Sequence, residues 1–193
     1  MQELLEDTDE FVADTALLNL GVIAKNAPSV AEHVREILRE LVGKDSNLQA
    51  NQKPNSANAD SDLYLQLMSI GNTDDPTYDD LLYPYIEHQE FQIRGAALGV
   101  LARRKDHQDM VLTKVLQEKN PNVVDLITKN IIIFQNIPVP SGYLNAIRNS
   151  ILKTTIPETQ SRRLNFHLAL SPQHTNRDID FLKQLFYALL FQD

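Results

Sequence analysis

Apolar residues recur at every third or fourth position along most of the chain, which is the period of an amphipathic α-helix. In the first such segment Leu17, Leu20 and Ile23 share one face, and an Asn-Ala-Pro sequence at 26–28 ends the segment. No stretch alternates apolar and polar residues as a half-buried β-strand does. The pattern therefore predicts an all-α protein.

Prolines, glycines and capping side chains divide the pattern into ten predicted helices. The helices are Ala13–Lys25, one capped by Ser29 and ended by Gly43, Ser61–Ile70, Pro76–His88, Glu90–Arg104, His107–Lys119, Asn122–Gln135, Gly142–Lys153, Pro157–Leu170 and Arg177–Gln192. Pro84 should distort the last turn of its helix. The ten helices make five antiparallel pairs, with a pair-to-pair spacing of roughly 30–36 residues from Ser61 onward, which is typical of a helical solenoid.

A polar stretch separates the first pair from the rest. Lys44–Asp60 consists largely of serine, asparagine, glutamine, alanine and proline, and Leu48 is its only large apolar residue. Such a segment buries too little apolar surface to offset the entropy lost on ordering. We therefore expect a flexible polar loop at 44–60 within a single domain that spans residues 1–193.

One segment has the residue order of a known repeat family. Gly71 and an acidic turn at 74–75 end one helix, a leucine pair follows at 81–82, and residues 93–101 read Ile-Arg-Gly-Ala-Ala-Leu-Gly-Val-Leu. This order resembles a HEAT-like (armadillo-type) repeat. The resemblance implies a right-handed α-α superhelix of about five antiparallel helix pairs.

The resemblance also implies structural roles for four residues, namely Gly71, Arg94, Ala97 and Leu101. Ala97 would let adjacent helices approach closely, and Leu101 would fill the groove between pairs. Arg94 would bond to carbonyl groups or carboxylates of a neighbouring turn, for which the acidic turn at 74–75 is one candidate.

A second group of segments is similar to the α-helical domain of the large lipid transfer (vitellogenin-like) family. These segments are 16–21, 67–72 and 101–104, with the polar insertion between the first two. In that family the helical domain is a curved scaffold around lipid-holding β-sheets. The resemblance implies the same helical fold, but this sequence contains none of those sheets.

Charge is divided unevenly along the chain, whose net charge is −8. Residues 1–90 carry 18 acids and five bases, residues 91–193 carry eight acids and 13 bases, and Met1–Asp14 holds six acids and no base. Nucleic-acid affinity depends on clustered Lys and Arg, so an acidic chain argues against that partner. The positive C-terminal half leaves an acidic protein partner open.

Several features constrain the compartment and the class of protein. The chain has no cysteine, which excludes a disulfide framework and a thiolate zinc site. No apolar run is long enough to span a membrane, and Met1–Phe11 does not resemble a signal peptide. These observations favour a cytoplasmic location, with secretion still open if a signal has been removed.

The five histidines form no zinc-binding helix motif. His88, His107 and His174 are assigned to turns, where solvent-facing side chains are expected. His167 lies in an apolar helix and is expected to be a hydrogen-bonded packing residue.

Four aspartates at 74, 75, 79 and 80 are dense enough to suggest calcium, but their spacing is not that of a calcium loop. Capping of a helix N-terminus accounts for them better. Since no phosphate loop or nucleophile motif occurs either, we expect no enzyme activity, no metal and no cofactor.

Two polar surfaces are candidates for binding a partner. The basic cluster of Arg103, Arg104 and Lys105 is explained by its place at a helix C-terminus, but it could also dock an acidic tail. A polar ridge across three repeats would suit an extended acidic peptide, although a solvated face explains it equally well. The ridge consists of Lys114, Gln117, Arg148, Asn149, Lys183 and Gln184.

The last predicted helix is apolar on nearly every side, whereas a terminal repeat should have a polar outer face. We therefore expect either that the chain is a fragment of a longer protein or that this helix pairs with another copy. The contact residues would be Phe181, Phe186, Tyr187, Leu190 and Phe191.

These features favour a non-enzymatic protein-interaction or scaffolding module that presents a curved helical surface. The partner would be another protein or another domain of the same protein. A lipid-binding or lipid-transfer module is the alternative, and a HEAT-repeat enzyme of the bilin lyase kind is a third.

Overall fold

The computed structural model describes residues 2–49, 59–133, 141–153, 157–170, 180–185 and 187. Throughout these residues the regular elements are helices and no β-strand occurs, so the all-α prediction is confirmed. The α-helices are α1 (Gln2–Leu5), α2 (Glu10–Asn26), α3 (Pro28–Gln49), α4 (Ala59–Thr73), α5 (Phe91–Leu101), α6 (Gln108–Gln117), α7 (Pro121–Ile133), α8 (Ser141–Lys153) and α9 (Pro157–Leu170). Three short 3₁₀-helices are η1 (Pro76–Leu81), η2 (Tyr83–Tyr85) and η3 (Lys105–His107).

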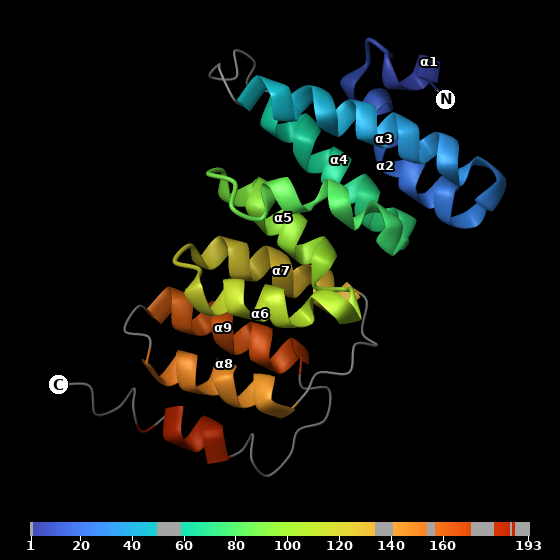
Figure 1. Ribbon diagram of the computed structural model, residues 1–193. Helices are drawn as coiled ribbons and strands as arrows, with labels where there is room; N and C mark the ends of the chain where they lie inside the picture. Colours follow the sequence, from blue (N-terminus) through green and yellow to red (C-terminus); the bar gives the residue numbers. More distant parts are fainter. Residues whose placement is uncertain are drawn as a thin grey trace.

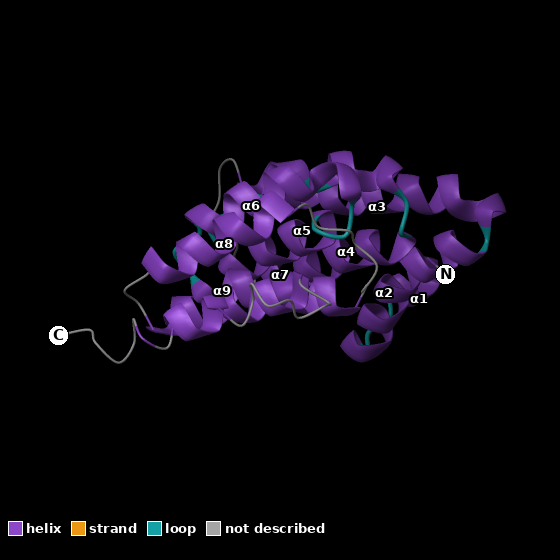
Figure 2. Cartoon of the chain, turned by 90° about the horizontal axis from the view of Figure 1, so that it is seen from below, coloured by secondary structure: helices purple, strands orange, loops and turns teal. Residues whose placement is uncertain are grey.

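The helices lie in two layers, which Figure 2 shows edge-on. One layer contains α2, α4, α5, α7 and α9, and each of these helices packs on the next. The other layer contains α3, α6 and α8, while η1 packs on α3 and η2 on α5. The N-terminal helices and the segment 180–185 lie at opposite ends of the molecule (Figure 1).

Helix α5 is at the centre of the stack and is buried on almost every side. Its residues from Gly95 to Leu101 are all buried. A Cβ atom at Gly95 would lie 2.6 Å from Leu126 of α7, and one at Gly99 would lie 2.6 Å from the Asn130 side chain. Glycines one turn apart therefore allow α5 and α7 to approach more closely than larger residues would permit.

The apolar faces of both layers form one continuous core that extends from Leu17 in α2 to Leu185 near the C-terminus. Leu67, Ile70 and Leu101 are fully buried in its centre. Burying each such side chain stabilises the fold by about 1.5–3 kcal/mol relative to leaving it exposed. Ala97, also fully buried, is the small residue that the repeat resemblance placed at a close contact.

Two predicted boundaries in the first helix pair are wrong. Helix α2 begins at Glu10, because the Asp9 side chain accepts a hydrogen bond from the backbone N–H of Phe11 and caps the helix. Helix α3 begins at Pro28 and continues past Gly43 to Gln49. Glycine ends a helix readily when it adopts a positive φ, and no described glycine does so.

The predicted loop at 44–60 is correspondingly shorter. Residues 44–49 belong to α3, and residues 59–60 belong to α4. Residues 50–58 lie outside the described residues. So does most of the last predicted helix, of which residues 180–185 and 187 are helical.

The predicted helix Pro76–His88 is the two 3₁₀-helices η1 and η2 instead. Proline at 84 has no N–H to donate to a carbonyl one α-helical turn earlier, so an α-helix cannot continue through it. In a 3₁₀-helix the backbone N–H bonds to the carbonyl three residues earlier. Leu82 N bonds to Asp79 O in this way, and Tyr85 N bonds to Leu82 O, each at 3.0 Å. This irregular segment shapes the candidate site.

Candidate functional site

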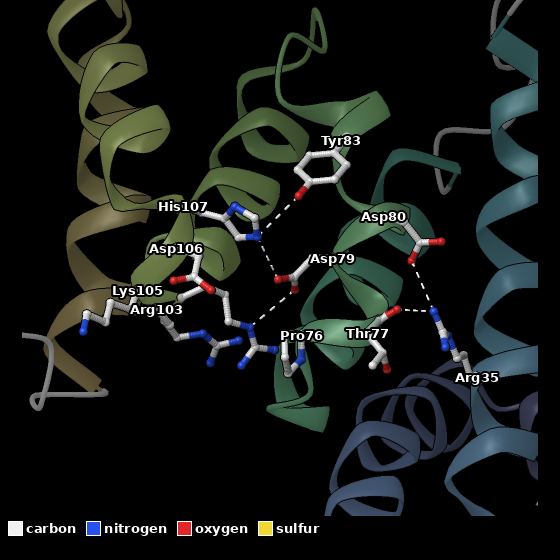
Figure 3. Close-up of a pocket in the computed structure, with 11 residues that line it drawn as sticks. Arg35, Pro76, Thr77, Asp79, Asp80, Tyr83, Arg103, Lys105, Asp106 and His107 are labelled. Carbon is white, nitrogen blue, oxygen red and sulfur yellow. Dashed lines mark hydrogen bonds and ion pairs between the residues drawn. The ribbon is translucent and has the colours of Figure 1, made fainter.

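A cavity of about 690 Å³ opens where the turn after α4 approaches the turn after α5 (Figure 3). Its walls come from α3, η1, η2 and η3, together with the two arginines that follow α5. We call it the arginine pocket, because Arg35, Arg103 and Arg104 line it.

Hydrogen bonds fix the 3₁₀-helix η1 at its N-terminus and against helix α3. The Asp75 carboxylate caps it by accepting a 2.9 Å hydrogen bond from Thr77 N, with Pro76 next in the chain. Tyr78 is buried and donates a 2.7 Å hydrogen bond to the carbonyl of Ala31 in α3. These contacts hold Asp79 toward the interior and Asp80 toward α3.

Asp79 lies at the floor of the pocket with only 5% of its side chain exposed. Its Oδ1 accepts from Arg104 Nε at 3.4 Å, and its Oδ2 lies 3.0 Å from His107 Nε2 (Figure 3). The Tyr83 hydroxyl lies 3.4 Å from the same ring nitrogen. The carboxylate is thus held between a guanidinium and an imidazole.

Arg104 also reaches Asp74, whose backbone has a positive φ of 54°. Aspartate tolerates this left-handed conformation better than most residues, and here it aims the carboxylate at Arg104 Nη1, 2.8 Å away. Lys25 of α2 binds the other carboxylate oxygen at 3.2 Å. Burial raises the pKa of Asp74, but Lys25 and Arg104 outweigh it, so the pKa lies below its ordinary value.

Asp80 is shared by two arginines of α3. Arg39 Nη2 lies 2.9 Å from one carboxylate oxygen, and Arg35 Nη2 lies 3.6 Å from the other. Arg35 also donates to the Thr77 carbonyl and stacks 5.4 Å above the ring of Tyr78. These contacts fix the Arg35 guanidinium at one wall of the pocket.

Positive charge is therefore in excess around the pocket. Arg104 is shared by Asp74 and Asp79, and Asp80 is shared by Arg35 and Arg39. The lining as a whole has four cationic side chains, on Arg35, Arg103, Arg104 and Lys105, and three carboxylates, on Asp79, Asp80 and Asp106. Within the part of the chain that the structure describes, the buried Arg104 Nη2 has no hydrogen-bond partner.

The pKa of Arg103 is lowered by burial and by this excess of positive charge. Its side chain covers Gly71, where a Cβ atom would overlap the guanidinium. Burial, and after it the charge of Arg104, lowers the pKa of Arg103 to about 10. Gly71, which the sequence marked as a repeat residue, thus makes room for a pocket residue.

An arrangement of this kind is suited to binding an anion. Guanidinium groups recognise carboxylate and phosphate oxygens through several parallel hydrogen bonds. The imidazole of His107 has its described polar contacts with Asp79 and Tyr83. Among the described residues, no serine or threonine hydroxyl is hydrogen-bonded to that ring.

The basic cluster of Arg103, Arg104 and Lys105 is the part of the pocket that sequence reasoning identified. The assignment of His107 to a solvent-facing turn is wrong, because its ring contacts Asp79 and Tyr83 and its side chain is only 21% exposed. The aspartates also differ from expectation. Asp75 alone is an N-cap, whereas the other three form ion pairs.

Arg94 does not bond to the acidic turn at 74–75. Its Nε and Nη2 bind the Glu118 carboxylate at 2.8 and 3.2 Å, and its Nη1 donates to the carbonyls of His88 and Gln89. Arg163 of α9 closes the group by donating to the carbonyl of Glu118 at 3.0 Å. We call Arg94, Glu118 and Arg163 the Glu118 cluster.

The polar ridge is only partly available to a partner. Gln117 of α6 and Asn149 of α8 are exposed, as are Lys183 and Gln184. Lys114 forms an ion pair with Glu87, and Lys183 lies 3.7 Å from Asp180.

Arg148 is not a free ridge residue, because its Nε donates to His167 Nε2 at 2.9 Å. His167 is fully buried, which confirms its predicted role in hydrogen-bonded packing. Both side chains pack on the ring of Phe181. Phe181 is therefore buried within its own chain and is not available as the predicted contact with another copy.

Of the other predicted contact residues at the C-terminus, Tyr187 is 60% exposed. Phe186, Leu190 and Phe191 lie outside the residues whose side chains the structure describes, and His174 lies outside the described chain. His88 packs near Tyr85, and His33 lies exposed beside Glu36.

In the described ranges no three histidine, aspartate or glutamate side chains are grouped to hold a metal ion. The helices described there include none that is both long and apolar enough to cross a membrane. Comparison of the chain with protein-family models, curated proteins and solved structures found no match.

Proposed function

We propose that this protein is a non-enzymatic interaction module that docks an acidic segment of a partner protein in the arginine pocket. The observation that carries the proposal is an excess of cationic side chains in a preformed cavity, whose lining has four of them against three carboxylates. An incoming carboxylate would relieve the repulsion between Arg103 and Arg104.

The scaffold is proposed to be a right-handed superhelix of HEAT-like repeats with about five helix pairs. Two features support this. Helices α2, α4, α5, α7 and α9 pack in sequence order, and the remaining elements cover one side of that row. In a repeat protein of this kind, turns of successive repeats lie side by side and build a surface for a partner. The pocket joins two such turns.

The chemistry of the lining favours a protein partner over a lipid. Ligand sites for acyl chains are lined mainly by apolar side chains. Here the lining includes Arg35, Arg103, Arg104, Lys105 and three aspartates. A carboxylate-rich peptide matches this lining, whereas a hydrocarbon chain would leave the charges desolvated and unpaired.

A peptide-binding experiment tests the proposal. Fluorescence anisotropy of a labelled polyglutamate peptide would be measured with the wild-type protein and with an Arg103→Gln/Lys105→Gln variant. The variant removes two positive charges from the lining, so binding is expected to weaken about tenfold or more. Affinity should also fall when the salt concentration rises from about 0.1 M to about 1 M.

The matched control is Lys119→Gln/Lys153→Gln, which removes two exposed charges elsewhere. Affinity close to wild type is expected for this variant. An equal loss in both variants would mean that net charge alone attracts the peptide, and the pocket would then not be a docking site. Circular dichroism would verify that each variant keeps its helical content.

A further inference from the structure

We propose that the arginine pocket binds the acidic segment 3–14 of a second copy of this chain, so that copies associate head to tail. This inference rests on the proposed function, because it names the acidic partner of the same pocket. It is argued from the charge, conformation and position of that segment.

The N-terminal segment is the most acidic part of the chain. Met1–Asp14 contains six acidic side chains and no basic one. Five of the acids, at positions 3, 6, 7, 9 and 10, are exposed, and four of these lie at the corner between α1 and α2. The corner therefore concentrates negative charge at one place on the surface, and cationic side chains outnumber carboxylates in the pocket lining by four to three.

Hydrogen bonds within the corner hold it in one conformation. Asp7 Oδ1 accepts from Asp9 N at 2.9 Å, and Asp9 Oδ1 accepts from Phe11 N at 3.0 Å. A segment that is already ordered loses less conformational entropy when it binds. The corner can therefore present its carboxylates to a partner at a low entropic cost.

An aromatic side chain accompanies the acids. Phe11 is 78% exposed, an unusual environment for a phenylalanine, and Tyr83 at the pocket is 45% exposed. Interfaces are enriched in aromatic residues and in arginine. Contact of Phe11 with Tyr83 would cover both rings while the carboxylates meet the guanidinium groups.

The segment does not reach the pocket of its own chain, so its partner is a separate copy and the contact is head to tail. Helix α1 packs on α2, and no residue of the segment 3–14 lines the pocket of its own chain. The segment 3–14 and the pocket are two different surfaces of the molecule, so a contact between them is heterologous. Such a heterologous contact produces open chains, or rings if the rotation closes.

Sedimentation velocity over a range of protein concentrations tests the inference. The weight-average sedimentation coefficient of the wild type should rise with concentration at about 0.1 M salt and stop rising at about 1 M. A segment variant, Glu3→Lys/Glu6→Lys, should be monomeric, and so should a pocket variant, Arg103→Gln/Lys105→Glu. The control Lys119→Gln/Lys153→Gln should still associate.

Mixing the two monomeric variants separates head-to-tail contact from other modes of association. The segment variant keeps an intact pocket and the pocket variant keeps an intact segment, so the mixture should form a 1:1 dimer and nothing larger. A mixture that stays monomeric, or a wild type that is monomeric at every concentration, would overturn the inference.

The polyglutamate experiment separates the two proposals. If the wild type stays monomeric but its pocket still binds polyglutamate, the self-association is wrong and the docking function stands. If the pocket binds neither polyglutamate nor the N-terminal segment, both proposals fail together.

Discussion

Two clusters of arginines and carboxylates lie at the two ends of α5, and they differ in how their charges are balanced. At the N-terminal end, the Glu118 carboxylate makes a bidentate pair with Arg94 and accepts a hydrogen bond from Asn120 N. At the C-terminal end, Arg103 and Arg104 lie side by side in an open cavity. The Arg94–Glu118 pair is closed within the fold, while the pocket is open and its lining has one more cationic side chain than carboxylates.

The difference underlies the two roles that we propose, a structural one for the Arg94–Glu118 pair and a binding one for the pocket. Every donor-bearing nitrogen of Arg94 has an acceptor within the fold, and Glu118 is only 11% exposed. The Arg94–Glu118 pair therefore leaves no guanidinium nitrogen of Arg94 available to a ligand. In the pocket, Arg104 acts to lower the pKa of Arg103, while Asp74 and Asp79 act against that effect. Perturbed electrostatics of this kind occur at functional sites and also in structural ion-pair networks, and the proposed docking function assigns the pocket to the first kind.

Removal of Arg94 should produce the largest loss of stability and is the most direct test of the comparison. The variant Arg94→Met leaves the Glu118 carboxylate buried without its partner, and such a loss typically costs about 3–5 kcal/mol. Thermal unfolding followed by circular dichroism would measure it. As a control, Arg162→Met breaks a more exposed ion pair with Asp125 and should cost less than about 1 kcal/mol. Equal losses would show that the Glu118 cluster is not the stronger one.

The two neighbouring arginines of the pocket should differ from each other. Arg104→Met leaves the buried Asp79 with only His107 as a basic partner and should cost about 2–3 kcal/mol. Arg103→Met removes a charge that burial and Arg104 already disfavour, so stability should stay constant or rise by about 1 kcal/mol. Thermal unfolding of both variants under one set of conditions provides the measurement. A larger loss for Arg103→Met would mean that Arg103 is a structural residue.

The sequence predicted the helical class and most helix positions, because an apolar residue every third or fourth position is visible without the fold. It failed at Pro76–His88, where Pro84 and the Tyr78 anchor produce 3₁₀-helices. The predicted end of the second helix at Gly43 was also wrong, because Gly43 does not adopt a positive φ and α3 continues to Gln49.

For the site, the sequence revealed only the part that is contiguous. Arg103, Arg104 and Lys105 are neighbours in the chain, but Asp79 lies 25 residues before Arg104 and 28 before His107. Contacts over that separation depend on how one helix pair stacks on the next. A signal was present: Asp74 and Arg104 are 30 residues apart, about one repeat, so an acidic turn precedes a basic turn at the repeat spacing.

The smallest predicted effect concerns acid, and it separates the charge of Glu118 from its hydrogen bonds. Burial raises the pKa of Glu118, but hydrogen bonds from Arg94 and the backbone N–H of Asn120, with the charge of Arg94, bring it below the ordinary value of 4.5. In the interval between the lowered pKa and 4.5 the unfolded chain binds more protons than the folded protein does. The stabilising contribution is therefore complete above 4.5 and is lost as the pH falls through the folded pKa.

Glu118→Gln keeps the shape of the side chain and an acceptor for Arg94 but removes the charge. The variant should be about 1–2 kcal/mol less stable than the wild type near neutral pH, and this gap should close as the pH drops below 4.5. Urea unfolding of both proteins between about pH 7 and about pH 3 gives the gap directly. Asp74 and Asp125 also have lowered pKa values, but they titrate in both proteins and cancel in the difference. If the difference in free energy of unfolding stays constant with pH, the stability of the cluster comes from shape and hydrogen bonding. The charge of Glu118 would then not be what distinguishes this cluster from the pocket.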